Sequence, residues 1–468
     1  MKYFITLIIF AISMIPVSSW AVCSWNGNTG TVTSPYAQSD LSACITDASG
    51  KTGEVLIQIP SGNWTYSSAV TVNMRSEFTN VTGLTIRGQN DCTFDSGGRP
   101  TACGANIANF AFSYTGKEGK SFRVAHMRIT GSSESYIDGD GKSWRFDHIF
   151  YDNVDASSRI NWIKRGTAGW VTYGVFDHLY VLSPKKILIH IESGVDGGNL
   201  EWMNPLGLGT EDACYIENSK FSNPTGIYPA TPTDTTGAGK FVFRYNEVLN
   251  MYLNAHDAIV YGYRGVRKWE VYNNMFTYNH PNSSWFVFAG RAGSGVIFNN
   301  TINDPNNYLN NSGIQVGVYR TYQTGGPPWG NLCSNTSGKA ILDISTNYPQ
   351  TCSNGTGCIQ IDGSASSPNG WPCRDQLGAS GNNPQIGGGQ PFLLWNNSKN
   401  GDYNVAPYIN GYANASYTIS GRDYCYAATA MPSSCNGVTT TYTPYAYPHP
   451  LTQTIQTGVK PNSPQNLR

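Results

Sequence analysis

The chain has few charged residues and no net charge. Lysine, arginine, aspartate and glutamate make up 13% of its 468 residues, with 30 basic and 30 acidic side chains. A nucleic-acid binder needs a basic surface, so this balance argues against nucleic acid as a partner. It also argues, more weakly, against steering toward a strongly anionic polymer.

The chain also lacks metal-site spacings and long internal hydrophobic runs. It contains no CxxC pair and no HxxxH sequence. Beyond the N-terminus no stretch is long and apolar enough to span a membrane. The first residues combine Lys2, an apolar run from Phe4 to Val17, and the small residues Ser19 and Ala21. This pattern predicts a signal peptide over residues 1–21, cleaved near Ala21, and a secreted protein, extracellular or periplasmic.

Eleven cysteines fit an oxidising destination. Proximity in the sequence suggests five pairs, although spacing alone does not fix connectivity. The suggested pairs are Cys23–Cys44, Cys92–Cys103, Cys333–Cys373, Cys352–Cys358 and Cys425–Cys435. They leave Cys214, which lies in an apolar strand-like segment and is expected to be a buried, inert thiol.

A short phrase recurs along the chain, with apolar residues alternating around a histidine or asparagine. Its polar centres are His126, His148, His178, Asn218, Asn246, Asn274 and Asn300. Their spacing ranges from 22 residues (148 minus 126) to 40 residues (218 minus 178). A strand-length unit repeated at irregular intervals predicts stacked parallel strands joined by loops of variable length, which is a solenoid.

The rest of the chain is organised around this stack. A helix over Ser39–Thr46 is expected to cap its open N-terminal end. Strands are predicted at Val55–Ile59, Leu84–Arg87 and Phe392–Trp395, and a disulfide-stapled loop at 91–105. Segments 183–213 and 222–239 are expected to be long loops. One domain spans 22–430, with disulfide-pinned loops from about 311, and a Pro-rich tail covers 431–468.

The polar centres have a structural interpretation. Asparagines at the same place in successive coils can hydrogen-bond to one another, so Asn218, Asn246, Asn274 and Asn300 are predicted to form a ladder. The three histidines at the same position are predicted to stack in a row. Stacked imidazoles project in parallel and do not converge on a metal ion.

The phrases FVFRYNEVLN, WEVYNNMFTY and GVIFNNTIND resemble coils of the secreted right-handed parallel β-helix proteins of the pectate-lyase-like superfamily. The resemblance covers roughly residues 55–310 and extends more weakly to 430. It implies an all-β fold with three parallel sheets per turn, in a protein that acts on polysaccharides. The superfamily includes lyases, hydrolases, adhesins and phage spikes, so fold alone does not fix activity.

The densest group of reactive residues is the segment NAHDAIVYGYRGVRKWEV. Residues one coil apart in a solenoid lie about 4.8 Å apart, so this segment and its neighbours can line one groove. The catalytic candidates are His256, Arg264, Arg267, Asp212 and Glu211. The candidate substrate-binding residues are Arg244, Asp257, Tyr263, Lys268 and Arg291.

Three functions can use such a groove. In β-elimination from a uronic acid, His256 would be the base and Arg264 or Arg267 would hold the carboxylate, with Ca²⁺ bound through Asp196, Glu211 and Asp212. Glycoside hydrolysis would need two carboxyl groups, which Glu211 and Asp212 offer.

The third function is glycan binding without catalysis. The 29 tyrosines and 12 tryptophans suit the flat faces of sugars, and they equally suit packing between strands. We therefore expect a secreted carbohydrate-active protein that binds or cleaves an extracellular polysaccharide, as a lyase or a glycoside hydrolase. A non-catalytic surface or adhesion protein is the alternative.

Overall fold

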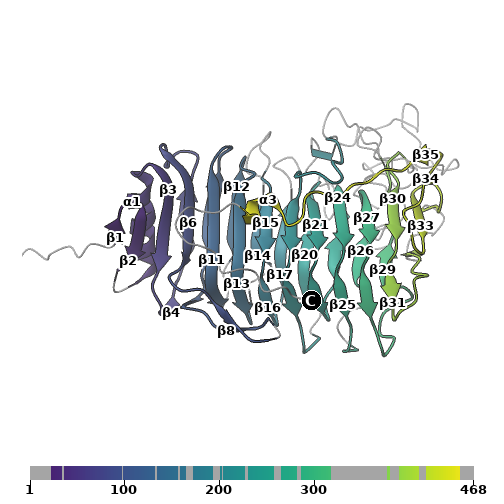
Figure 1. Cartoon of the computed structure of the whole chain (residues 1–468), viewed down its shortest axis with the longest axis horizontal. Coiled ribbons are helices and arrows are strands. Elements are labelled where there is room, and N and C mark those ends of the chain that lie inside the picture. Colours follow the sequence, from purple (N-terminus) through teal and green to yellow (C-terminus); the bar gives the residue numbers. More distant parts are fainter. Residues whose placement is uncertain are drawn as a thin grey trace, which may run out of the picture.

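The computed structural model describes residues 23–33, 36–96, 98–131, 134–155, 159–164, 172–192, 201–202, 204–226, 230–257, 265–281, 286–317, 377–379, 389–409 and 418–453. These residues form a right-handed parallel β-helix, as the repeated phrase predicted. Figure 1 shows the coils stacked along one long axis, from β1 at one end to β33 at the other.

Two sheets form the coil among the described residues, one of 21 strands and one of ten. The 21-stranded sheet bends at a corner into two walls, and β11 and β13 run through both. The first wall contains β2 (Thr29–Val32), β3 (Gly53–Ile59), β6 (Val81–Gly88), β11 (Ser121–Thr130), β13 (Trp144–Asp152), β15 (Gly174–Asp177), β18 (Cys214–Glu217), β21 (Lys240–Arg244), β24 (Lys268–Tyr272), β27 (Ser294–Phe298), β30 (Phe392–Trp395) and β33 (Tyr424–Ala427). The second wall adds β4 (Gly62–Thr65), β9 (Ala105–Ala108), β16 (Tyr180–Leu182), β19 (Lys220–Ser222), β22 (Glu247–Leu249), β25 (Met275–Thr277), β28 (Thr301–Asn303) and β31 (Ser398–Lys399).

The ten-stranded sheet closes the coil, and every neighbouring pair of its strands is parallel. Its strands are β5 (Val70–Asn73), β10 (Phe112–Gly116), β12 (Ser135–Gly139), β14 (Arg159–Lys164), β17 (Ile187–Glu192), β20 (Thr231–Thr235), β23 (Leu253–Ala255), β26 (Phe288–Gly290), β29 (Ile314–Val316) and β32 (Tyr408–Ile409). Segments 183–213 and 222–239, expected to be loops, contribute β17 and β20. The loop prediction for these two stretches is wrong.

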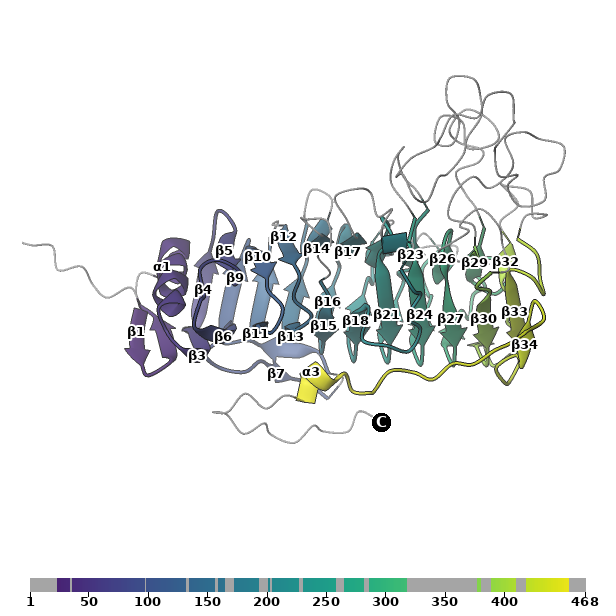
Figure 2. The ribbon, with the colours of Figure 1, turned by 90° about the horizontal axis from the view of Figure 1, so that it is seen from above.

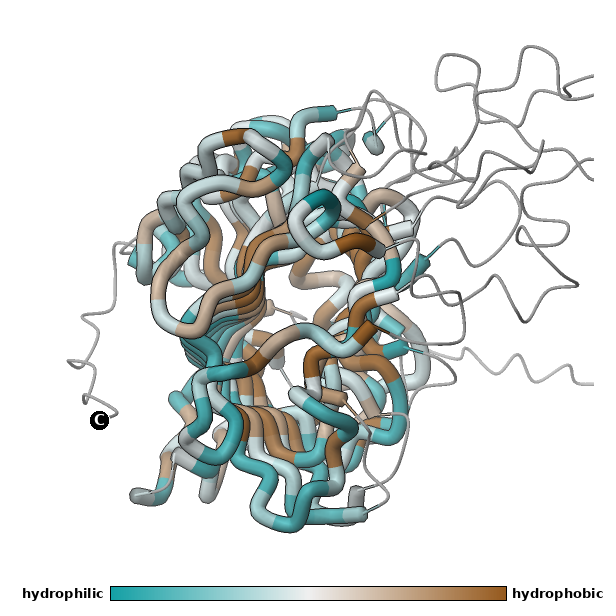
Figure 3. The backbone as a smooth tube through the Cα atoms, turned by 90° about the vertical axis from the view of Figure 1, so that its right-hand side faces the viewer, coloured by the Kyte–Doolittle hydropathy of each residue, from teal (hydrophilic) through white to brown (hydrophobic). Residues whose placement is uncertain are grey.

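Apolar side chains fill the interior because successive residues of a strand point alternately into and out of the coil. Equivalent residues of neighbouring coils then stack. The ring centroid of Phe146 lies 5.2 Å from that of Phe176, its register partner one coil later, and 5.0 Å from that of Phe112, which reaches it across the interior from β10. Figure 3, viewed along the axis, shows hydrophobic residues following one another from coil to coil.

The N-terminal end is capped as predicted. Helix α1 (Gln38–Ser49) buries Leu41, Cys44 and Ile45, and β1 (Cys23–Asn26) pairs antiparallel with β2. A disulfide between Cys23 and Cys44 joins the helix to β1. The cap covers apolar side chains that the first coil would otherwise expose.

Part of the predicted tail lies against the body. After the hairpin of β34 (Ser434–Cys435) and β35 (Val438–Thr439), the chain runs back along the outside of the first wall. It ends in α3 (Pro450–Gln453), which contacts β13 and β15 (Figure 2). We call residues 440–453 the strap. Residues 454–468 lie outside the described part of the chain.

The corner between the two walls explains the repeated phrase. One residue per coil adopts a left-handed backbone conformation there, with φ of 57° at His126, 53° at His148, 51° at His178 and 50° at Asn218. Histidine and asparagine tolerate this conformation better than most residues. In later coils the same corner is made by Tyr245, Asn273, Asn299 and Asn396.

The asparagine ladder lies one residue after the corner. Asn246 accepts a hydrogen bond from the Ser219 backbone at 2.9 Å, and the bonds continue through Asn274 and Asn300 to Asn397. The prediction is confirmed for Asn246, Asn274 and Asn300 and is wrong for Asn218, a corner residue. Asn397 was missed because 97 residues separate it from Asn300.

Three of the five suggested disulfides are present. They are Cys23–Cys44, Cys92–Cys103 and Cys425–Cys435, with Cα separations of 5.2, 4.0 and 5.8 Å. These bonds indicate an oxidising environment. Cys214 is a buried free thiol, as expected. The pairs Cys333–Cys373 and Cys352–Cys358 fall outside the described residues, as does the predicted signal peptide.

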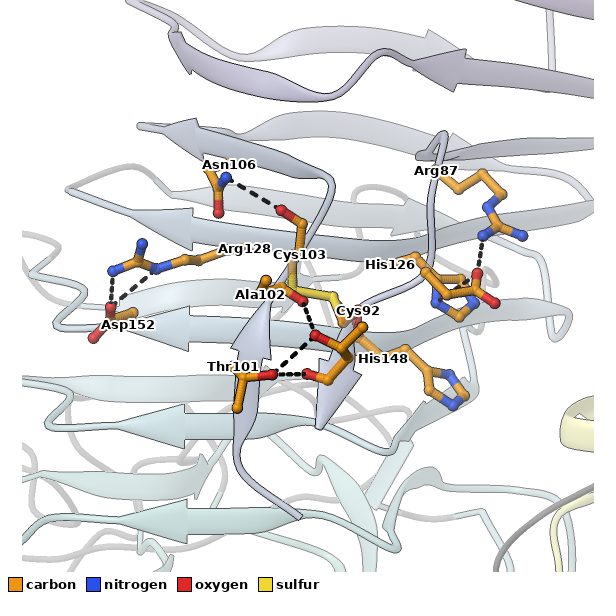
Figure 4. The surroundings of a disulfide bond; sticks show 12 residues. Arg87, Cys92, Thr101, Ala102, Cys103, Asn106, His126, Arg128, His148 and Asp152 are labelled. Carbon is orange, nitrogen blue, oxygen red and sulfur yellow. Dashed lines mark hydrogen bonds and ion pairs between the residues drawn. A yellow bond between two sulfur atoms is a disulfide. The ribbon is translucent and has the colours of Figure 1, made fainter. Parts of the chain in front are cut away.

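The stapled loop at 91–105 is a small hairpin. Strands β7 (Thr93–Phe94) and β8 (Pro100–Ala102) pair antiparallel, and the Cys92–Cys103 bond packs against Phe150 and Tyr180 of the second wall. Figure 4 shows the hairpin beside β11 and β13. Among the described residues no helix has the length and apolar character needed to span a membrane.

Candidate functional site

The ten residues proposed as a site do not all face one groove. Tyr263 and Arg264 lie outside the described residues. The first wall carries Arg244 and Lys268, whose side chains are both fully buried. The Lys268 ammonium pairs with Glu270 at 3.2 Å and donates to the Gly207 carbonyl at 2.6 Å. These two positions are covered by the protein itself, Lys268 by the loop that contains Gly207.

Glu211 and Asp212 belong to that same loop. They pair with Lys142, with Nζ–oxygen distances of 3.5 Å and 2.7 Å. Lys142 lowers the pKa of Asp212 against the opposing effect of partial burial. Lys142 thus already pairs with two of the three oxygen donors considered for a calcium ion, and the third, Asp196, lies outside the described residues.

Arg267 directly precedes β24. It is fully buried, donates to Gln390 Oε1 at 2.6 Å, and places its guanidinium 5.2 Å from the centre of the Trp202 ring. The neighbouring Val266 backbone donates to the His256 carbonyl at 2.8 Å. Arg267 therefore lies next to the backbone contact between Val266 and His256.

His256, Asp257 and Arg291 do come together. The His256 Nδ1 atom lies 3.0 Å from Asp257 Oδ1, and its Nε2 atom lies 3.3 Å from Arg291 Nη1. A guanidinium can only donate, so a hydrogen bond between these two atoms requires Nε2 to accept. Arg291 also lies 3.7 Å from Asp257 Oδ1.

This trio extends a row of polar residues on the outer face of the ten-stranded sheet. In β17, Ile189 and Ile191 point inward, so His190 and Glu192 point outward. Strand register places His190 beside Asp234 of β20, and Asp234 beside Asn254 of β23. His256 follows two residues after Asn254 and lies on the same face.

Two ion pairs join His190 to its neighbours. Its Nδ1 lies 3.5 Å from Asp234 Oδ2, and its Nε2 lies 3.3 Å from Glu192 Oε2. Burial lowers the pKa of His190, but the two carboxylates outweigh it and raise the pKa overall. Burial raises the pKa of Asp234, but His190, His256 and Arg291 outweigh it and lower the pKa overall. This arrangement favours an ionised Asp234 beside a protonated His190.

The row continues toward the N-terminal end as aromatic residues. Tyr136, Trp162 and His190 are in register on successive strands. The ring centroid of Trp162 lies 5.4 Å from that of Tyr136 and 6.0 Å from that of His190. Arg159 and Lys164 place their charges 3.7 Å and 4.7 Å from the centre of the Trp162 ring. The outer face thus offers polar and aromatic contacts over successive coils.

The sequence reasoning missed His190, Glu192, Asp234, Asn254 and Trp162. The alternation in ILIHIE is the signal that could have found His190 and Glu192, because isoleucine at every second position is typical of a half-buried strand. Asp234 was missed because it lies in a segment rich in threonine and proline, a composition that is typical of loops.

The histidine row at the corner is confirmed as a stack. Ring centroids of His126 and His148 lie 4.7 Å apart, as do those of His148 and His178. Figure 4 shows the first two side by side. Within the described residues, one group of donors has the closeness of a metal site, namely His126, Asp147 and His148, whose ligand atoms lie within 4.8 Å of one another.

A cation is poorly accommodated there. Both oxygens of Asp147 accept hydrogen bonds from Arg123 at 2.6 Å, and Arg145 lies 3.4 Å from the same carboxylate. Two guanidinium groups already neutralise Asp147 and would repel a metal ion. The corner histidines are therefore structural.

Comparison with family models, curated proteins and solved structures found no match.

Proposed function

We propose that the protein is a secreted carbohydrate-active protein that binds and cleaves an extracellular polysaccharide on the outer face of the ten-stranded sheet. The site extends from β17 to the residue after β26. The resemblance of the coils to the pectate-lyase-like superfamily supports the proposal at the level of architecture. The disulfides, which suit an extracellular destination, support it as well.

One observation carries the proposal. Four successive coils bring His190, Asp234, His256 with Asp257, and Arg291 together on one outer face. A polymer lying along the axis would follow these residues coil by coil, at steps of about 4.8 Å, and since His190, Asp234 and Asp257 are only 4%, 8% and 0% exposed, its binding has to uncover them. Clusters of buried, mutually perturbed ionisable groups are concentrated at functional sites, although structural networks also produce them.

The chemistry of the cluster suits cleavage. An ionised Asp234 can accept a proton or stabilise a cationic sugar, a protonated His190 can donate a proton, and Arg291 can hold negative charge. Elimination and hydrolysis of a glycosidic bond both use an acid and a base.

The test is incubation of the secreted protein with a panel of neutral and uronic polysaccharides. Unsaturated products, detected by absorbance, identify a lyase, and new reducing ends alone identify a hydrolase. Asp234→Asn and His256→Ala should each abolish product formation. His178→Asn is the matched control, because Asn218 occupies the equivalent corner position one coil later.

Two outcomes would count against cleavage. Binding without products, lost in Asp234→Asn, would favour the glycan-binding or adhesion protein that the sequence left open. Full activity in both site variants would refute the site itself.

A further inference from the structure

Two residues in register on adjacent strands in the middle of the proposed site each have a buried acceptor atom without a hydrogen-bond partner. The atoms are Oδ1 of Asp234 and Oδ1 of Asn254, in residues that are 8% and 6% exposed. Neither atom accepts a hydrogen bond within the part of the chain that the structure describes. Their strands, β20 and β23, pair in parallel with Asp234 directly opposite Asn254.

An unsatisfied buried acceptor is costly, and two on adjacent strands call for an explanation. A ligand that donates a hydrogen bond to each of the two oxygen atoms would explain why the protein leaves them unsatisfied. The other outward groups of the cluster restrict what that ligand can be. His190 and Arg291 place positive charge beside Asp234, which disfavours a metal cation or an ammonium group at this point.

A carboxylate is disfavoured for the opposite reason. The Asp234 carboxylate would face it directly, and the amide oxygen of Asn254 would add a second negative dipole. A hydroxyl group carries no charge and can donate to either oxygen. Hydroxyls on one sugar ring, or on two neighbouring rings, can therefore satisfy both acceptors.

We propose that the sugar unit held over Asp234 and Asn254 is uncharged and donates a hydroxyl to each of them, so that these two residues select a neutral sugar at this position. The inference rests on the proposed function, and it makes Asp234 and Asn254 residues that determine specificity. It predicts discrimination against a uronic acid at the central position of the site.

The experiment is calorimetric titration with matched pairs of oligosaccharides of equal length: glucan and glucuronan, galactan and galacturonan, mannan and mannuronan. The wild-type protein should bind one neutral member at least about tenfold more tightly than its uronic partner, since about 1.4 kcal/mol corresponds to a factor of ten. Asn254→Leu, which removes one acceptor, should weaken neutral binding about tenfold.

Asp234→Asn removes the negative charge of the side chain and keeps its shape. It should weaken neutral binding and at the same time reduce the discrimination against the uronic partner, because the repelling charge is gone. Thr301→Ala, on the exposed second wall, should change neither quantity, and circular dichroism checks the fold of each variant.

Tighter binding of a uronic oligosaccharide by the wild-type protein, with a preference unchanged in Asp234→Asn, would overturn the inference and leave the proposed function standing. If no oligosaccharide of the panel binds, both fall.

Discussion

Arg244 and Glu217, on adjacent strands of the first wall, form an ion pair of 2.6 Å between side chains that are both completely buried. The strap covers the pair. Arg244 donates to the carbonyls of Tyr445 and Ala446 at 2.8 Å, and Glu217 accepts from the His449 backbone at 2.8 Å. The pair therefore ties the C-terminal segment to the body of the β-helix.

Breaking this pair should be costly. Arg244→Ala leaves a buried carboxylate without its partner, which destabilises a protein by about 3–5 kcal/mol. The measurement is the free energy of unfolding in urea. Lys220→Ala is the control, because Lys220 and Glu247 form a half-exposed pair worth less than about 1 kcal/mol. Equal losses of unfolding free energy in Arg244→Ala and Lys220→Ala would contradict the stabilising role of the buried pair.

The strap should detach at low pH. Burial, with the nearby charge of Arg244, lowers the pKa of His449 to about 4, and the Leu451 backbone donates to the unprotonated Nδ1. In a detached strap the pKa returns to its ordinary value of 6.5. The contribution of His449 to docking is therefore complete above pH 6.5 and is lost as the pH falls toward 4, by up to about 3 kcal/mol.

Protonation of Glu217 has the opposite effect on docking of the strap. Burial raises the pKa of Glu217, so the docked state binds this proton more readily than the detached state and is favoured at low pH. The larger shift of His449 should prevail. The protection factors of residues 440–453 against hydrogen exchange, in which the intrinsic pH dependence of exchange is divided out, should fall as the pH is lowered from 7 to 4.5, and His449→Gln should flatten that dependence. Protection factors that do not change with pH in the wild-type protein would refute the role of His449.

The asparagine ladder should contribute strongly to stability. Asn274 donates to the Phe243 carbonyl and to Asn300, and its Oδ1 accepts from Asn246. Asn274→Ala leaves several buried groups without partners, at about 1–3 kcal/mol for each group. The unfolding midpoint in urea should fall clearly, whereas Thr301→Ala should leave it nearly unchanged.

The pH dependence of any cleavage should reflect His190 and Asp234. The pKa of Asp234 is lowered, so the carboxylate stays ionised in mild acid, and the pKa of His190 is raised, so the imidazolium persists toward neutral pH. The rate should be high on the acidic side and should fall as the pH rises through the raised pKa of His190. In His190→Gln the alkaline fall should disappear together with most of the rate.

The sequence predicted the two walls of the long sheet well and the site only in part. The repeated phrase marks the corner where the first wall meets the second, so it located the stack, the histidine row and most of the asparagine ladder. The ten-stranded sheet carries no such phrase. Some of its strands, such as β23 at Leu253–Ala255, are too short to show a period.

Arg244 and Lys268 entered the candidate set because they lie near His256 in sequence. In a coil of three walls, however, residues a dozen positions apart face different directions. Residues one full coil apart, such as Asp234 and Asn254, are the true neighbours. To assign a residue to a wall, one must know where the chain turns between walls. The loops vary in length, so the sequence does not show where these turns fall.

The most direct test is a crystal structure of His256→Ala with an oligosaccharide bound, chosen from the sugars that the panel selects. The account predicts electron density for the ligand along the outer face of the ten-stranded sheet, with a sugar hydroxyl within hydrogen-bond distance of Asn254. Ligand density confined to the two walls of the long sheet, or to the ends of the β-helix, would contradict it.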